Sequence, residues 1–153
     1  MSFGYQVLGF GSGGAAPSTY VVASGGTITT VDTNFKVHTF TGPGTFCVST
    51  AGCGSDTGVD YLVIAGGGAA GANYAGGGGA GGYRESNPGA WTGSPIALSC
   101  GAIAVSATGY PITVGGAGAN SVFSSITSAA GGNGGTECPF PGVAGGSGGG
   151  AGY

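Results

Sequence analysis

Charge is scarce in this chain of 153 residues, which has a formal net charge of −3. The cations are Lys36 and Arg84, and the acids are Asp32, Asp56, Asp60, Glu85 and Glu137. Surfaces that bind DNA or RNA need clustered Lys and Arg to neutralise phosphates, so we expect no nucleic-acid partner. The longest apolar-looking stretch, residues 61–70, is short and contains several glycines, so we expect no membrane insertion.

Residue sets for catalysis and metal binding are scarce as well. The chain has one histidine, His38, and none of its cysteines forms a Cys-x-x-Cys pair. The pair Asp56 and Asp60 resembles the start of a calcium loop, but the downstream Glu of such loops is missing. Gly-x-Gly-x-x-Gly matches such as residues 76–81 lack the strand–loop–helix context of a nucleotide site. We therefore expect no enzyme activity, no metal and no cofactor, and we expect His38 to be a partly buried, hydrogen-bonded strand residue.

The cysteines leave the redox chemistry open. Four are present, and they allow three disulfide pairings, among which the sequence does not choose: Cys47, Cys53, Cys100 and Cys138. Buried free thiols are the alternative to one or two disulfides. In an oxidising environment the favoured pair is Cys47 with Cys53, because only five residues intervene.

Glycine is the most abundant residue. It occupies 40 of the 153 positions, whereas its ordinary share of a protein sequence is about 7 %. Glycine loses more backbone entropy on folding than any other residue, so neither a helix nor an isolated strand suits a glycine-rich run. An ordered run must find partners for its backbone N–H and C=O groups. We therefore expect residues 66–82 to pack against other extended segments, with Gly77 and Gly79 at the close approach.

The remaining sequence is typical of β-structure, because apolar residues nowhere recur at helical spacing. Residues 20–23 and 27–31 are predicted strands separated by a hairpin-type break at Gly25-Gly26. Residues 59–65 form the strongest predicted strand, and their apolar composition predicts burial on both faces. Further short strands are predicted at residues 35–41, 45–49, 110–114 and 121–126. Five aromatic residues are predicted to form the core: Phe40, Phe46, Tyr61, Tyr110 and Phe123.

These patterns predict an all-β fold, with a small β-sandwich-like domain, glycine-rich extended segments and essentially no helix. We divide the chain into an N-terminal docking segment, a β-rich block, a glycine-rich segment with a loop, a second β-rich block and a glycine-rich tail. Their boundaries are residues 1–17, 18–65, 66–95, 96–130 and 131–153.

Two groups of residues are candidates for contacts with partners. Large apolar side chains crowd the N-terminus at Phe3, Tyr5, Val7, Leu8 and Phe10, and they either dock on a partner or form a strand in the chain's own core. Tyr83, Arg84 and Trp91 lie in polar loop contexts, and residues of these types are enriched in interfaces. Ordinary loop packing is the alternative for this second group.

Several motifs occur in a recognisable order. They are FGYQVLGFG at residues 3–11, HTFTGPGTF at 38–46, VDYLVIAGGG at 59–68, GGGGAGGYR at 76–84, ITVGGAG at 112–118 and SVFSSI at 121–126. This order resembles the glycine-rich domain of virion proteins of tailed phages, marine phages among them, and the resemblance covers most of residues 1–130. It implies a β-domain followed by extended segments in polyglycine II, which has three residues per turn and about 3.1 Å rise, as in polyproline II.

The resemblance also implies a function. We expect a non-catalytic structural protein of the phage particle, a tail-fibre or adhesin-type subunit. A capsid-surface decoration or head-fibre protein is the alternative, and an ice-binding protein is a more remote one. The expected partners are other virion proteins, further copies of this chain and a receptor on the host surface. The expected location is the extracellular virion, assembled in the host cytoplasm.

Overall fold

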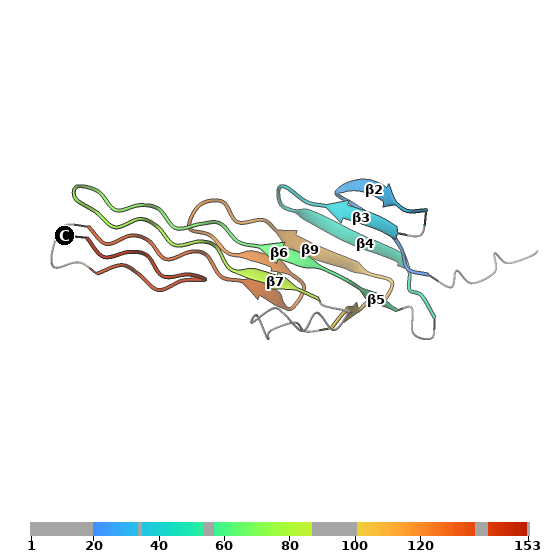
Figure 1. Cartoon of the computed structure of the whole chain (residues 1–153). Helices are drawn as coiled ribbons and strands as arrows, with labels where there is room; N and C mark the ends of the chain where they lie inside the picture. The colour runs from blue at the N-terminus through green and yellow to red at the C-terminus, as the bar shows by residue number, and fades with distance from the viewer. Residues whose placement is uncertain (1–19, 34, 54–56, 87–100, 137–140, 153) are drawn as a thin grey trace, which may run out of the picture.

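A computed structural model describes residues 20–33, 35–53, 57–86, 101–136 and 141–152 of the chain. These residues form an all-β structure without a helix, as the sequence predicts, so none of them provides a helix able to cross a membrane. Figure 1 shows two parts, a group of β-sheets and a set of long glycine-rich segments that run side by side away from the sheets.

The β-part is built from short strands that pair antiparallel. In the described part of the chain, a sheet of five strands has the order β1-β4-β9-β10-β11, and three two-stranded sheets pair β2 with β3, β5 with β8 and β6 with β7. The strands are β1 (Val22–Ser24), β2 (Thr27–Val31), β3 (Phe35–Thr39), β4 (Gly44–Thr50), β5 (Gly58–Val59), β6 (Leu62–Ile64), β7 (Tyr83–Glu85), β8 (Ile103–Ala104), β9 (Gly109–Thr113), β10 (Ser121–Phe123) and β11 (Ile126–Ser128).

The core lies where the five-stranded sheet faces β6 and β7, which gives a small sandwich-like arrangement. Phe46 of β4 and Phe123 of β10 are buried with their ring centroids 6.0 Å apart and their planes nearly perpendicular. Phe40, Tyr61 and Tyr110 are half-buried and pack against this centre. All five aromatic residues predicted for the core therefore contribute to it, and edge-to-face ring contacts add to the stabilisation from apolar burial.

The strand at residues 59–65 differs from its prediction. It is split into β5 and β6, and β6 is covered on one face only, so that Val63 is buried while Leu62 and Ile64 are 58 % and 56 % exposed. The expected burial on both faces is wrong, because the single neighbouring layer leaves the outer face of β6 open. The apolar composition of a strand does not reveal how many layers cover it.

Strand pairing across Gly25-Gly26 also differs from a simple hairpin. Both glycines have positive φ, at 106° and 65°, and form the expected turn. However, β1 pairs with β4 and β2 pairs with β3, so the two strands beside the turn belong to different sheets. A Cβ atom on Gly25 would lie 2.1 Å from the Thr45 carbonyl oxygen, so this turn requires glycine for its close approach to β4 as well as for its φ.

Candidate functional site: a bundle of glycine-rich segments

Glycine-rich segments lie side by side beyond the sheets (Figure 1) and are joined to one another by backbone hydrogen bonds. We name them segment I (residues 65–71), segment II (76–82), segment III (129–136), segment IV (142–145) and segment V (146–152). They are continuous with the β-part, because segment I follows β6, segment II precedes β7 and segment III follows β11. Glycine and alanine dominate all five, so backbone groups rather than side chains hold the bundle together.

Segments I and II are joined by hydrogen bonds that recur every three residues. The amides of Ala65, Gly68 and Gly71 donate to segment II carbonyls at 3.0, 2.8 and 3.1 Å. Segment II repeats the spacing, because its amides at 76, 79 and 82 all donate to segment III. Three residues per turn is the period of polyproline II-type helices, and here the bonds run sideways to neighbouring segments. The expected polyglycine II-like segments are thus present, and the prediction that residues 66–82 pack against other extended segments is confirmed.

Segment III occupies the centre of the bundle. The amides of Gly131 and Gly134 each donate to segment I at 2.9 Å, and those of Gly132 and Gly135 each donate to segment V at 2.8 Å. Its carbonyls accept bonds from segments II, IV and V. All four of these glycines are buried. A backbone that is buried on so many sides is tolerable only because its polar groups are paired with other backbone groups.

The sequence of segment III matches this position. Residues 130–136 read Ala-Gly-Gly-Asn-Gly-Gly-Thr, a repeat of one larger residue followed by two glycines. With three residues per turn, the first glycine of each repeat donates its amide to segment I and the second donates its amide to segment V, while the larger residue Asn133 is exposed. Asn133 therefore lies where a side chain fits.

Steric contacts explain why the inward positions are glycine. A Cβ atom on Gly79 would lie 2.1 Å from the Ser147 carbonyl oxygen, and one on Gly134 would lie 1.9 Å from the Gly76 carbonyl oxygen. At Gly77, in contrast, nothing lies within 4 Å of that position. The close approach expected at Gly77 is therefore wrong, because a side chain at this position would point away from the bundle. Of the two glycines, Gly79 alone makes a tight contact.

Two asparagine side chains complete the backbone pairing, and sequence reasoning missed both. Asn120 Oδ1 accepts a bond from the Ala130 amide at 2.8 Å, and Asn133 Oδ1 accepts one from the Ala69 amide at 2.9 Å. A side-chain amide oxygen resembles a peptide carbonyl, so each asparagine acts in place of a neighbouring segment. In the sequence, Asn133 stands between two pairs of glycines at a three-residue spacing, and this pattern could have identified it as a functional residue.

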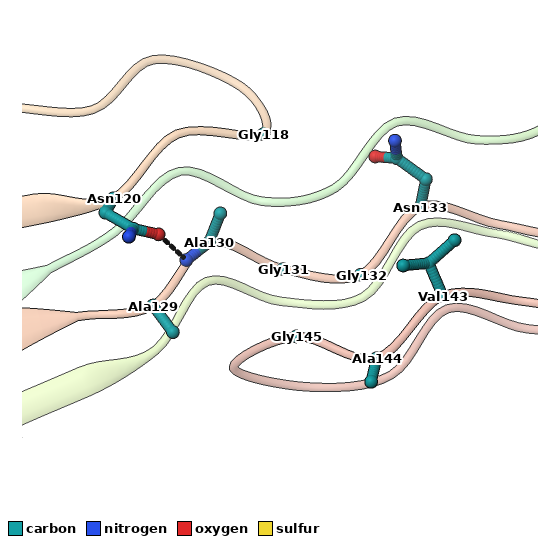
Figure 2. Close-up of a pocket in the computed structure, with 10 residues that line it drawn as sticks. All are labelled: Gly118, Asn120, Ala129, Ala130, Gly131, Gly132, Asn133, Val143, Ala144 and Gly145. Carbon is teal, nitrogen blue, oxygen red and sulfur yellow. Dashed lines mark hydrogen bonds between the residues drawn. The ribbon is translucent and has the colours of Figure 1, made fainter.

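An open groove of about 330 Å³ runs along one side of the bundle. Figure 2 shows segment III along it, with Asn120, Asn133 and Val143 around it. The described residues that line it are glycine, alanine, the two asparagines and Val143, and none of them is charged or aromatic. These residues offer backbone groups, side-chain amides and small apolar groups.

The predicted contact residues Tyr83 and Arg84 lie in β7, at the junction of the sheets and the bundle. Tyr83 is exposed and its hydroxyl donates to Glu85 Oε2 at 2.6 Å, a bond that raises the pKa of the tyrosine. Arg84 is half-buried. Trp91 lies outside the described part of the chain. The same holds for the predicted docking residues, which are Phe3, Tyr5, Val7, Leu8 and Phe10.

The cysteines at 47 and 53 are free and exposed in the structure, whereas Cys100 and Cys138 lie outside the described residues. Cys47 lies inside β4, and the strand continues for three more residues, or about 10 Å at the usual rise per residue. A disulfide holds its two α-carbons less than about 7 Å apart, so the chain after β4 would have to fold back to form one. The expected Cys47–Cys53 bond is not formed in this arrangement, and its presence in the assembled protein stays a prediction.

His38 contributes to the β-part rather than to a reactive site. Its Nδ1 lies 2.8 Å from the Gly25 carbonyl oxygen, and its ring packs edge-on against Phe46 with centroids 5.1 Å apart. The prediction of a partly buried, hydrogen-bonded strand residue is confirmed. Among the described residues, no three His, Cys, Asp or Glu side chains gather into a set able to hold a metal ion.

Comparison with known proteins supplies one match. The sequence model of a family described as a glycine-rich domain matches residues 39–153, which include β4 to β11 and all five segments of the bundle. No curated protein and no solved structure matches the chain.

Proposed function

Because the chain belongs to the glycine-rich domain family, we propose that it is a non-catalytic structural subunit of a tailed-phage particle, of the tail-fibre or adhesin type. The observation that carries the proposal is the bundle itself, an extended body held by backbone hydrogen bonds at a three-residue period. The order of sequence motifs, which resembles glycine-rich virion proteins, supports the phage assignment.

The construction of the bundle suits a mechanical role. Segment III is bonded to four neighbouring segments, so bending the bundle requires several backbone hydrogen bonds to break together. The bonds are made between neutral groups, and the described part of the bundle carries no charged side chain. Salt screens interactions between exposed charges, whereas bonds between neutral groups are little affected by it. A body of this kind keeps its shape over a wide range of ionic strength, as an extracellular particle requires.

The outer end of the bundle supports an adhesin-type role. Segments I and II are joined there by residues 72–75, at the end away from the sheets (Figure 1). Asn73 and Tyr74 in this turn have positive φ, at 55° and 31°, and Tyr74 is 84 % exposed. Tyrosine is enriched in binding surfaces because it supplies a large contact area at low conformational entropy. We assign the host-facing contact to this turn.

A map of the purified particle tests the proposal. Mass spectrometry should find the chain in purified virions, and cryo-electron microscopy should place its extended density on a tail or fibre, with the 72–75 turn outermost. Absence of the chain from intact virions would refute the proposal. Density lying flat on the capsid would instead favour the alternative role of a capsid-surface decoration or head fibre.

A host-binding assay tests the adhesin assignment separately. Particles carrying Tyr74→Ala should adsorb to host cells less than the parent, whereas Gly77→Ala, an outward substitution on segment II, should leave adsorption unchanged. Equal adsorption by Tyr74→Ala and parent particles would remove the turn from the contact. A thermal hysteresis assay on the purified protein checks the remote ice-binding alternative, for which we expect no activity.

A further inference from the structure

On one side of the central segment, none of the described residues forms a neighbouring segment. Segment III is bonded to segments I, II, IV and V, and the groove of Figure 2 opens between segment IV and the loop that carries Asn120. In a bundle of polyglycine II helices the neighbours surround each helix, so this groove has the position of a missing segment. The described glycine-rich segments already have places in the bundle.

The groove also presents one backbone donor that a missing segment would satisfy. The Ala130 amide is bonded to the Asn120 side chain rather than to a backbone carbonyl. The backbone amide of Asn133 lies three residues, or one turn, further along the segment and projects to the same side. This backbone N–H makes no hydrogen bond among the described residues. An unpaired backbone donor on an open edge is a site where another chain can pair.

We propose that a second copy of this chain fills the groove, and that the entering element is its segment IV. Segment IV forms one wall of the groove, so two copies related by a two-fold axis place each segment IV in the groove of the other. This is an isologous contact, in which both copies use the same surface.

Val143 supports this choice of occupant. It is a β-branched apolar residue at the groove, 56 % exposed, on a segment that otherwise consists of glycine and alanine. Entry into the groove of a second copy buries this side chain and brings an extended glycine-rich backbone beside the Asn133 amide. The described residues of the lining carry no charge, so they add no like-charge repulsion to the approach of two identical surfaces.

Charge placed at Val143 tests the proposal. We expect the parent protein to sediment as a dimer, with twice the 14.1 kDa mass of one chain. Val143→Arg and Val143→Glu should each sediment as monomers, because the two-fold axis brings two like charges together. An equimolar mixture of the two variants should restore the dimer. Ala80→Arg, on the exposed part of segment II and outside the groove lining, is the matched control and should stay dimeric.

The oligomeric state of the parent protein and of the Val143 variants supports or overturns the proposed dimer. A parent protein that stays monomeric up to the highest soluble concentration overturns the proposal, as does a Val143→Arg variant that remains dimeric. Monomeric variants whose mixture also stays monomeric show that the two Val143 residues do not face each other, which overturns the two-fold arrangement. Circular dichroism spectra of the variants that match the parent show that the monomers are folded.

Discussion

Ser121 and Ser128 lie directly opposite each other across the β10–β11 pair, and both are buried, yet within the described part of the chain only one of their hydroxyl groups has a hydrogen-bond partner. Ser121 Oγ accepts a bond from the Gly115 amide at 3.0 Å. Ser128 Oγ has no partner among the described residues, and its residue is 0 % exposed. The same residue type on neighbouring strands is therefore a stabilising contact in one case and a desolvation cost in the other.

Alanine at these two serines should give opposite results. Ser121→Ala leaves the Gly115 amide without an acceptor in a half-buried position and should lower the free energy of unfolding by about 1–3 kcal/mol. Ser128→Ala removes a buried hydroxyl that makes no bond, so its stability should equal or exceed that of the parent. Urea denaturation of both variants measures the difference. A larger loss for Ser128→Ala than for Ser121→Ala would mean that the Ser128 hydroxyl has a partner.

Two glycines of segment II give a matched test of the bundle. Gly79→Ala places a methyl group against the Ser147 carbonyl oxygen and should destabilise by about 1–3 kcal/mol or more, as overpacking does. Gly77→Ala meets open space, and loss of freedom in the unfolded chain should stabilise by about 0.4–1 kcal/mol. Thermal and urea unfolding of the two variants check this. Equal effects at both positions would show that segment II has no inward and outward sides.

Two tyrosines should ionise in a defined order. Hydrogen bonding to Glu85 raises the pKa of Tyr83, and hydrogen bonds from Ser106 lower the pKa of Tyr110. As pH rises, Tyr110 should therefore lose its proton before Tyr83, which NMR titration of the tyrosine ring carbons can follow. Glu85→Ala should lower the pKa of Tyr83, and Ser106→Ala should raise that of Tyr110. The reverse order would contradict at least one of the two hydrogen-bond assignments.

The N-terminal docking hypothesis remains a prediction, because it falls outside the described residues. Burying large apolar side chains contributes about 1.5–3 kcal/mol each, so five of them within eight positions are enough to anchor a subunit. Deletion of residues 1–10 should leave a folded protein that no longer enters particles. A truncated protein that does not fold would instead place these residues in the core.

The β-part was predictable where a pattern is local. The predicted strand at residues 110–114 corresponds to β9, in which Tyr110 and Ile112 are half-buried, and the aromatic residues marked the core. Partner choice was not predictable, because β4 pairs with β1 and β9 through contacts distant in the sequence. The exposure of Leu62 and Ile64 depends likewise on which faces of β6 other elements cover, which composition does not reveal.

The bundle was predictable as an ordered body but not in its arrangement. Glycine without charge implies backbone pairing, yet every glycine looks alike in the sequence, so Gly77 and Gly79 could not be told apart. Their roles depend on segment V, nearly seventy residues away in the chain, since Ser147 approaches Gly79. Asn133 was detectable in principle, because it interrupts the glycine pairs at a three-residue spacing.

Amide hydrogen exchange measured by NMR tests the central claim most directly, which is that a three-residue backbone network holds the bundle. The hydrogen-bonded amides of Gly76, Gly79 and Gly82 should exchange slowly, as should those of the central segment at 131, 132, 134 and 135. The amides of segment II that make no hydrogen bond in the structure, at 77, 78, 80 and 81, should exchange far faster. Uniformly fast exchange through segments II and III, or protection without the three-residue spacing, would contradict the account.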